Sequence, residues 1–347
     1  MLKKWEQEGD IFVKKRFSTA SFVLAGLIAL AGCSSDASNG KTEEDKTKQY
    51  TIGLTQYAKH PSLDAATEGF KKALEDNGFK EGENVKFDFQ NAQADPNNTQ
   101  PIANNFVGDK VDLIFANATP SAVSALNATK EIPIVFTSVT DPVGAGLVEA
   151  LDKPGTNITG TTDNHPDATK KTIDFITEQI GAKKIGVVYN AGEQNSEVQV
   201  DQVNKLAGEK GAKLVKASVS TTAEVKQATE SLVGRVDAIY IPTDNTVVSA
   251  LDSVISVAND KKIPLFVGEL DSMKKGAVAA TGFSYFDIGY QTGEMAADIL
   301  KADKKPSEIP VELPKDLKLM INRQAADAQG VEVKPEWEKI GEFFEGK

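Results

Sequence analysis

The chain of 347 residues contains an internal repeat, and this repeat limits the fold more than any other feature of the sequence. The segment VDLIFANATPSAVSAL at residues 111–126 matches VDAIYIPTDNTVVSAL at residues 236–251 without a gap. Each copy opens with a short apolar run, typical of a buried strand, and closes with apolar residues at helical spacing. We therefore predict that each copy forms a strand, a turn and a helix, and that the chain folds into two similar lobes.

The turns between these strands and helices are rich in residues that start helices. They read NATPS at 117–121 and PTDNT at 242–246. Hydroxyl and carboxylate side chains in such positions accept hydrogen bonds from the free N–H groups of the first helical turn. In an open α/β sheet the carboxyl ends of the strands face the ligand crevice. The sequence thus predicts two matching turns that face each other across one cleft.

Charge and the scarce residue types exclude several kinds of site. The chain has 39 Lys and Arg against 50 Asp and Glu, a net charge of −11, which argues against a nucleic-acid partner. Its two histidines, His60 and His165, and its single cysteine, Cys33, cannot form a His/Cys metal cluster or an intrachain disulfide. The spacing of a calcium loop is also missing. We expect neither a metal nor a cofactor.

Residues 1–32 have the pattern of a targeting signal. Basic residues at 14–16 precede an apolar run over 20–31 that is too short to span a bilayer comfortably. The run ends in Leu30-Ala31-Gly32-Cys33, which resembles the lipobox of bacterial lipoproteins, where a peptidase cuts before a cysteine that carries diacylglycerol. An ordinary signal peptide with a chance cysteine is the alternative. We expect lipidation at Cys33, followed by a polar, flexible tether over 33–49.

From Tyr50 onwards, short strands alternate with amphipathic helices, which is typical of an α/β fold with doubly wound parallel sheets. The expected strands cover 51–55, 85–89, 113–115, 132–136, 184–189, 213–219, 238–241 and 263–267. The expected helices cover 64–77, 102–106, 170–180, 197–209 and 223–232. The pattern is less regular after residue 277, where we expect a helix over 289–300, an apolar run over 317–321 and a last amphipathic helix over 335–344.

Several long phrases resemble the substrate-binding lipoproteins of bacterial ABC importers, in particular the family with tryptophan- and other aromatic-amino-acid-binding members. They are IGLTQYAKHPSLDAA (52–66), IFANATPSA (114–122), IPIVFTSVTDPVGAGLV (132–148), IGVVYNAGEQNS (185–196) and IYIPTDNTVVSAL (239–251). The resemblance implies a two-lobed, periplasmic-binding-protein-like fold of type I with the ligand in the cleft between the lobes. It also implies delivery of that ligand to a membrane permease driven by an ATPase.

The resemblance further implies that the chain crosses between the lobes three times. Lobe 1 is then expected to comprise 50–159 with about 284–309, and lobe 2 to comprise 160–283 with about 310–347. We expect a monomer that meets the outer face of the cell membrane through its lipid anchor only. An aromatic amino acid such as tryptophan is the expected ligand.

An amino-acid ligand needs donors for its carboxylate and an acceptor for its ammonium group. On lobe 1, Thr119 and Ser121 offer hydroxyls at a helix N-terminus, whose N–H groups and dipole favour an anion. On lobe 2, Asp244 stands in the equivalent turn and can hold the ammonium group, with Glu269 after the next strand as its rival. Each of these residues could instead be a simple helix cap.

Other strand ends complete the predicted ligand site. Tyr57 and Tyr189 could stack on an aromatic ligand, or they could pack in the two cores. The remaining ligand-binding candidates come from the same turns and strand ends: Gln56, Pro120, Thr137, Ser138, Asn190, Asn195, Ser196 and Asn245.

Three alternative functions stay open at this point. The first is a surface sensor that closes on a ligand and signals through a membrane partner, the second is a hydrolase, and the third is a binder of a different small molecule. The sequence lacks a nucleophile elbow, a phosphate loop and a His–acid pair at recognisable spacing, which argues against an enzyme. A neighbouring permease gene would favour import, and a neighbouring receptor-kinase gene would favour the sensor.

Overall fold

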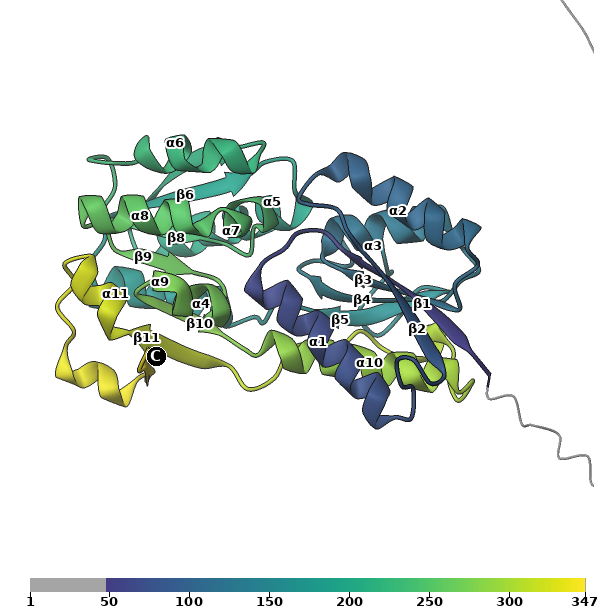
Figure 1. Cartoon of the computed structure of the whole chain (residues 1–347). Helices are drawn as coiled ribbons and strands as arrows, with labels where there is room; N and C mark the ends of the chain where they lie inside the picture. The colour runs from purple at the N-terminus through teal and green to yellow at the C-terminus, as the bar shows by residue number, and fades with distance from the viewer. Residues whose placement is uncertain (1–47, 347) are drawn as a thin grey trace, which may run out of the picture. The chain divides into compact units, whose positions relative to one another are not determined.

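The computed structural model describes residues 48–346, which belong to one compact unit and contain two β-sheets (Figure 1). The predicted signal peptide, Cys33 and nearly all of the predicted tether lie outside the described residues. Within residues 48–346, no helix has the length and apolar character that a membrane crossing requires.

The first sheet has five parallel strands in the order β2-β1-β3-β4-β5. Its strands are β1 (Tyr50–Gln56), β2 (Val85–Asn91), β3 (Leu113–Asn117), β4 (Ile134–Val139) and β5 (Ile158–Thr162). Alternate residues of β3 pack on opposite faces, because Phe115 joins the core under α1 (Pro61–Asp76) and α10 (Tyr285–Leu300), and Ile114 joins the core under α2 (Pro96–Gly108) and α3 (Thr119–Ala128). This sheet and its four helices form the first lobe.

The second sheet has seven strands in the order β12-β11-β10-β9-β8-β6-β7. They are β6 (Lys184–Asn190), β7 (Lys213–Val219), β8 (Ala238–Ile241), β9 (Leu265–Val267), β10 (Ala279–Gly282), β11 (Lys318–Asn322) and β12 (Glu342–Phe344). The associated helices are α4 (Ala168–Asp174), α5 (Gln194–Glu209), α6 (Val225–Glu230), α7 (Asn245–Ser249), α8 (Leu251–Lys261), α9 (Leu270–Gly276) and α11 (Arg323–Ala328). Short 3-10 turns cover Thr222–Glu224, Pro306–Glu308 and Pro335–Lys339. The second sheet and the helices packed on it form the second lobe.

The two copies of the repeat occupy equivalent places, as predicted. The first forms β3 and α3, and the second forms β8, α7 and α8. β3 lies between β1 and β4, and β8 lies between β6 and β9. In both sheets the order of strands reverses next to the repeat, at β1 and at β6, which is where open α/β sheets bind their ligands. The α/β fold with two doubly wound, mainly parallel sheets is therefore confirmed.

The predicted amphipathic helix over 335–344 is wrong. Residues Pro335–Lys339 form a 3-10 turn, and Glu342–Phe344 form β12, which pairs in parallel with β11. Trp337 is fully buried, lies 4.8 Å from the Phe175 ring and donates its indole N–H to the Gln179 side chain. The apolar residues of this segment therefore reflect separate tertiary contacts and not one helical face.

Two further details differ from the predicted pattern of the second lobe. The helix expected over 170–180 ends in a π-helical segment, Phe175–Gln179, which carries the ring that contacts Trp337. The strand β11 runs antiparallel to β10, so the parallel alternation stops at this edge of the sheet. The π-helical segment lies between the two copies of the repeat, whereas β11 lies in the region after residue 277 where the sequence pattern is least regular.

Helix α10 lies beside α1 although more than 200 residues separate them in the chain (Figure 1). Glycines let the two backbones approach closely. A Cβ atom at Gly289 would collide with the carbonyl oxygen of Ala66, and one at Gly69 would collide with the carbonyl oxygen of Phe286. The segment after β10 is thereby fixed on the first lobe.

Three segments connect the lobes. The first follows β5 and leads to α4, the second joins β10 to α10, and the third precedes β11. Before the third segment, Val311 still packs in the first-lobe core and Glu312 pairs with Thr161 next to it. The lobes therefore share a hinge built from three short stretches of chain.

Candidate site between the two lobes

The first lobe contributes the turn between β3 and α3, and this turn has a strained backbone. Ala118, the residue before α3, has φ of 82°, and Ser138 at the end of β4 has φ of 56°. Such angles cost a non-glycine residue about 1–3 kcal/mol and concentrate at functional sites. Backbone hydrogen bonds hold the start of this turn in place, since the N–H of Ala118 donates to the Thr137 carbonyl and the N–H of Tyr57 donates to the Asn117 carbonyl.

Two hydroxyls at this turn are buried without a partner. The Oγ1 atom of Thr119 and the Oγ atom of Ser138 form no hydrogen bond with any residue that the structure describes. Thr119 is not the cap of α3, because that position belongs to Ala118, whose side chain cannot accept a hydrogen bond. An unpaired buried hydroxyl is costly. Together with the first N–H groups of α3, these hydroxyls form a site that suits a carboxylate.

Most of the other predicted residues of the first lobe already have hydrogen-bond partners for their side chains. Tyr57 packs in the first-lobe core and donates its hydroxyl to the Ala94 carbonyl, and burial, followed by the charges of Glu193 and Asp244, raises the pKa of that hydroxyl. Pro120 follows Thr119 in the first turn of α3. The remaining side chains form hydrogen bonds within their own lobe: Gln56 with Asp64 and Thr67, Ser121 with Thr55, and Thr137 with Thr161.

In the second lobe, Asp244 caps helix α7. Its Oδ1 atom accepts from the N–H of Val247 at 2.8 Å, and its Oδ2 atom accepts from the Ser196 hydroxyl at 2.7 Å and from the N–H of Asn190. The carboxyl group is fully buried. Burial, and then the charge of the neighbouring Glu193, raises the pKa of Asp244 to about 7.

Glu193 is a second buried carboxylate at the same helix start, and the sequence analysis missed it. It accepts from the Asn245 amide at 2.6 Å and from the Thr246 hydroxyl at 2.7 Å, as well as from the backbone N–H groups of both residues. Glu193 lies three residues after the end of β6. The sequence analysis selected Tyr189 and Asn190 because they end this strand. Including the three residues that follow the strand would have added Glu193 to the candidates.

An unpartnered acceptor lies beside these carboxylates. The Asn195 amide donates to Glu193 and to the Thr243 carbonyl, whereas its Oδ1 atom is buried and meets no donor in the described part of the chain. Tyr189, by contrast, packs in the second-lobe core, where the Lys216 ammonium group lies 5.9 Å from its ring. The structure therefore groups Asn195 with Glu193 and Asp244 and places Tyr189 elsewhere.

Direct contacts join the two halves of the site. The Nε2 atom of His60, in the loop after β1, lies 3.5 Å from the Asn245 Oδ1 atom, and the Gln199 amide donates to the Thr140 hydroxyl at 3.2 Å. Glu269 forms a third contact, with Ser62 of α1. The predicted arrangement, in which the strand ends of the two lobes face each other, is thus present.

A small cavity lies between the lobes at the hinge. Its volume is about 10 Å³, which is close to the minimum for one water molecule. It is lined by the rings of Tyr240 and Phe283 and by polar groups that include Asp163 and Thr281. Asp163 is fully buried, accepts hydrogen bonds from Tyr285 and Thr140, and has a pKa raised by burial to about 6. This cavity has no room for a ligand larger than water.

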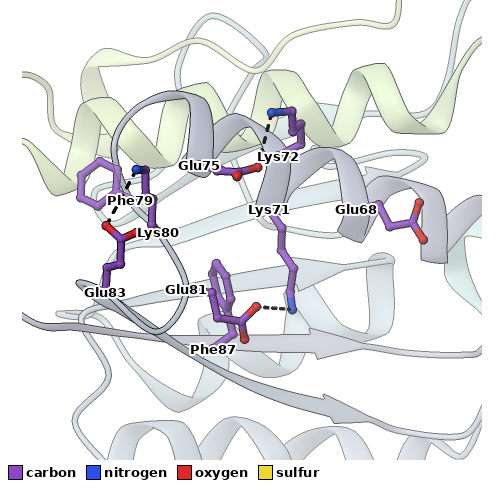
Figure 2. Close-up of a pocket in the computed structure, with 9 residues that line it drawn as sticks. All are labelled: Glu68, Lys71, Lys72, Glu75, Phe79, Lys80, Glu81, Glu83 and Phe87. Atoms are coloured by element: carbon purple, nitrogen blue, oxygen red, sulfur yellow. Dashed lines mark hydrogen bonds and ion pairs between the residues drawn. The ribbon is translucent and has the colours of Figure 1, made fainter.

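A larger pocket of about 500 Å³ lies away from this cleft, between α1 and β2 (Figure 2). Three lysines line it, and each is paired with a glutamate. Lys71 pairs with Glu81, and Lys72 and Lys80 pair with glutamates three residues further along the chain. These ion pairs are largely exposed, and the fourth glutamate of the lining, Glu68, forms no ion pair among the described residues. Among residues 48–346, no group of three or more His, Cys, Asp or Glu side chains could hold a metal ion.

Comparison with known proteins agrees with this architecture. The family model described as "ABC transporter substrate binding protein" matches residues 51–340. A protein named tyrosine-binding protein from Clostridioides difficile is 47% identical over 316 residues, which cover 89% of this chain and 91% of that protein.

Two solved structures are similar over nearly the whole described chain. The ABC domain in complex with L-Trp from Streptococcus pneumonia is 31% identical, with a TM-score of 0.80, and covers 86% of this chain and 100% of its own. The ligand-free, open structure of a substrate-binding protein with adhesive properties from Clostridium difficile is 45% identical, with a TM-score of 0.63 and the same coverage. The chain belongs to the ABC transporter substrate-binding protein family.

Proposed function

We propose that this chain is the extracytoplasmic substrate-binding component of an ABC importer, and that it closes on a free aromatic amino acid, with tyrosine and tryptophan as the first candidates. The observation that carries this proposal is that both lobes hold buried polar atoms without a partner in the described structure. They are the hydroxyls of Thr119 and Ser138 on the first lobe and the Asn195 Oδ1 atom on the second, in the neighbourhood of the hydrogen-bonded carboxylates of Glu193 and Asp244. An amino-acid zwitterion has the matching charges.

The proposed roles follow from this arrangement. Thr119 and Ser138, with the N-terminus of α3, receive the carboxylate. Asn195 accepts a hydrogen bond from the ammonium group, and the charge of Asp244 stabilises it in a site that excludes water. We assign stacking on an aromatic side chain to Tyr57, because the carboxylates of Glu193 and Asp244 are close enough to its hydroxyl to raise the pKa of that group. The names of the two ligand-binding relatives support an aromatic side chain.

Binding requires the lobes to separate and close again, because the cavity between them holds no more than a water molecule. The comparisons support such a motion. The 31% identical relative with L-Trp bound superposes better than the 45% identical relative in its open, ligand-free form. The arrangement described here is thus nearer to the ligand-bound one.

The ligand assignment is tested by calorimetry on the soluble domain that begins at Tyr50. We expect tyrosine or tryptophan to bind, and leucine and the desamino analogue of tyrosine, 3-(4-hydroxyphenyl)propanoic acid, to bind more weakly. If no aromatic amino acid binds, or if leucine binds as tightly as tyrosine, the proposed ligand class is wrong.

We further propose that the mature protein is anchored to the outer face of the cell membrane by diacylglycerol on Cys33, and that it acts as a monomer that delivers its ligand to a permease. The lipobox-like sequence LAGC supports the anchor. A Cys33→Ala variant is expected to lose fatty-acid labelling and to leave the membrane fraction. Unchanged labelling of this variant would refute the anchor.

A further inference from the structure

A buried hydrogen bond links the two lobes outside the proposed ligand contacts. The hydroxyl of Ser62, the second residue of α1 in the first lobe, donates to the Oε2 atom of Glu269 at 2.6 Å. Glu269 is the residue before α9 in the second lobe. Both side chains are buried, with exposed fractions of 0% and 2%. Water is therefore excluded from a contact that involves a carboxylate.

The same oxygen atom has a second donor that belongs to its own lobe. The hydroxyl of Ser272, in the first turn of α9, donates to Glu269 Oε2 at 2.7 Å. Ser272 moves with Glu269 when the lobes separate, because both belong to one short segment. Ser62 lies on the other lobe, so the bond that it forms can exist only while the lobes are closed.

The side chain of Ser62 forms no further hydrogen bond among the described residues and does not cap α1. The residue before this helix is His60, which forms no side-chain cap, and the turn is held by the N–H of Asp64 donating to the His60 carbonyl. Alanine in place of Ser62 removes one oxygen atom and favours the helix. This position thus allows the interlobe bond to be removed without disturbing the helix.

We propose that the Ser62–Glu269 hydrogen bond is a latch that holds the closed molecule and lengthens the residence time of the bound ligand without touching it. This inference rests on the proposed function, since a latch acts only if the protein closes on a ligand. Ser62 and Glu269 are then positioning residues. A hydrogen bond to a buried carboxylate that is made only in the closed state slows opening and leaves the first encounter with the ligand unchanged.

The test compares Ser62→Ala with Ser272→Ala, two variants that remove the same kind of donor from the same oxygen atom. Release of radiolabelled tyrosine, or of tryptophan if calorimetry favours it, is followed after dilution into unlabelled ligand. We expect Ser62→Ala to raise the dissociation rate about 10- to 100-fold with an unchanged association rate. Ser272→Ala is expected to lower the stability of the fold and to leave the dissociation rate close to that of the wild type.

The desamino analogue distinguishes a latch from a ligand contact. A latch predicts that Ser62→Ala accelerates release of the amino acid and of the analogue by the same factor. If the factor shrinks for the analogue, Glu269 holds the ammonium group and the latch is refuted. If the wild type binds but Ser62→Ala releases ligand at the wild-type rate, the latch alone is wrong. A wild type that binds no amino acid would overturn the proposed function and, with it, the latch.

Discussion

Thr119 illustrates at the scale of a single residue how an unsatisfied group can indicate a binding site. Its hydroxyl is buried at the start of α3 and pairs with nothing in the described structure. Folding gains nothing from this hydroxyl, because a buried donor without a partner loses its hydrogen bonds to water. A ligand carboxylate would restore the lost bond. A mutation that removes this hydroxyl should therefore affect the stability of the free protein and its affinity for the ligand differently.

We predict that Thr119→Val leaves the free energy of unfolding unchanged or raises it, while ligand affinity falls. The loss of one charge-assisted hydrogen bond costs about 1.5–3 kcal/mol, or about 10- to 100-fold in Kd. Calorimetry and urea unfolding measure the two effects. The matched control is Ser124→Ala in the same helix, which breaks a 2.8 Å bond to Thr99 and should lower stability without changing affinity. Equal affinity of Thr119→Val and wild type would contradict the carboxylate assignment.

Asp163 and Asp244 determine a pH dependence of stability. Burial raises the pKa of Asp163 to about 6, and burial together with Glu193 raises that of Asp244 to about 7. Between the ordinary value of 3.8 and these values, the folded protein holds protons that the unfolded chain has released. Stability must therefore fall as pH rises through this window.

We predict that the free energy of unfolding decreases between about pH 4 and about pH 7, and that Asp163→Asn makes this decrease shallower. Urea unfolding at several pH values measures the slope. The control is Asp76→Asn, because the hydrogen bond from Lys72 lowers the pKa of Asp76 and places its titration below this window. The linkage argument fails if Asp163→Asn has the same slope as the wild type.

At the scale of elements, the contact between α1 and α10 fixes the first lobe and depends on glycines. Backbone atoms of one helix occupy the space that a side chain at Gly289 or Gly69 would need. Backbone atoms cannot move aside as the end of a flexible side chain can. Even the methyl group of an alanine at either position would therefore push the two helices apart. The same contact ties the hinge segment after β10 to α1, the helix that carries Ser62.

We predict that Gly289→Ala destabilises the fold by about 1–3 kcal/mol through overpacking. The control is Gly208→Ala near the end of α5, where an added Cβ atom meets nothing within 4 Å. That change should stabilise the helix, by up to about 1 kcal/mol. Urea unfolding measures the change in the free energy of unfolding for both variants. Similar changes at the two positions would contradict a close backbone contact between α1 and α10.

At the scale of the whole molecule, function depends on both lobes contributing to one site. The contacts between His60 and Asn245, Thr140 and Gln199, and Ser62 and Glu269 all cross between the lobes. A ligand in this place touches both lobes and selects the closed population. It also stabilises the entire fold by mass action.

We predict that ligand binding slows amide hydrogen exchange in both turns, at residues 117–122 and 243–248. Saturating ligand at about 100 times its Kd should also raise the free energy of unfolding by about 2.7 kcal/mol. Exchange followed by mass spectrometry locates the protected segments. Edge strand β12 serves as an internal reference, since three strands separate it from β8 in the order of the second sheet. Protection confined to one lobe would argue against a ligand that bridges the cleft.

The sequence by itself determined the equivalence of the two repeat copies and most of the alternation of strands and helices, because hydrophobic periodicity and turn chemistry are local properties. The strands β5 and β10 were not among the expected strands. The sequence also located the strand ends that surround the cleft. A strand end, however, does not determine the partners of a side chain. Asp244 caps α7 through the N–H of Val247, and its other oxygen atom accepts from Ser196 and Asn190, which lie about fifty positions earlier. Tyr189, on the same strand as Asn190, packs in the second-lobe core.

Only the tertiary structure decided the contacts between segments that are distant in the chain. It placed β12 where the periodicity predicted a helix, because Trp337 packs against Phe175 and Phe343 pairs with a residue of β11. It also brought Glu193 to the start of α7 and Ser62 to Glu269. The contact of Ser62 with Glu269 depends on how the two lobes meet, and the others join segments of the second lobe that are distant in the chain. A local pattern of residues contains no information about either kind of contact.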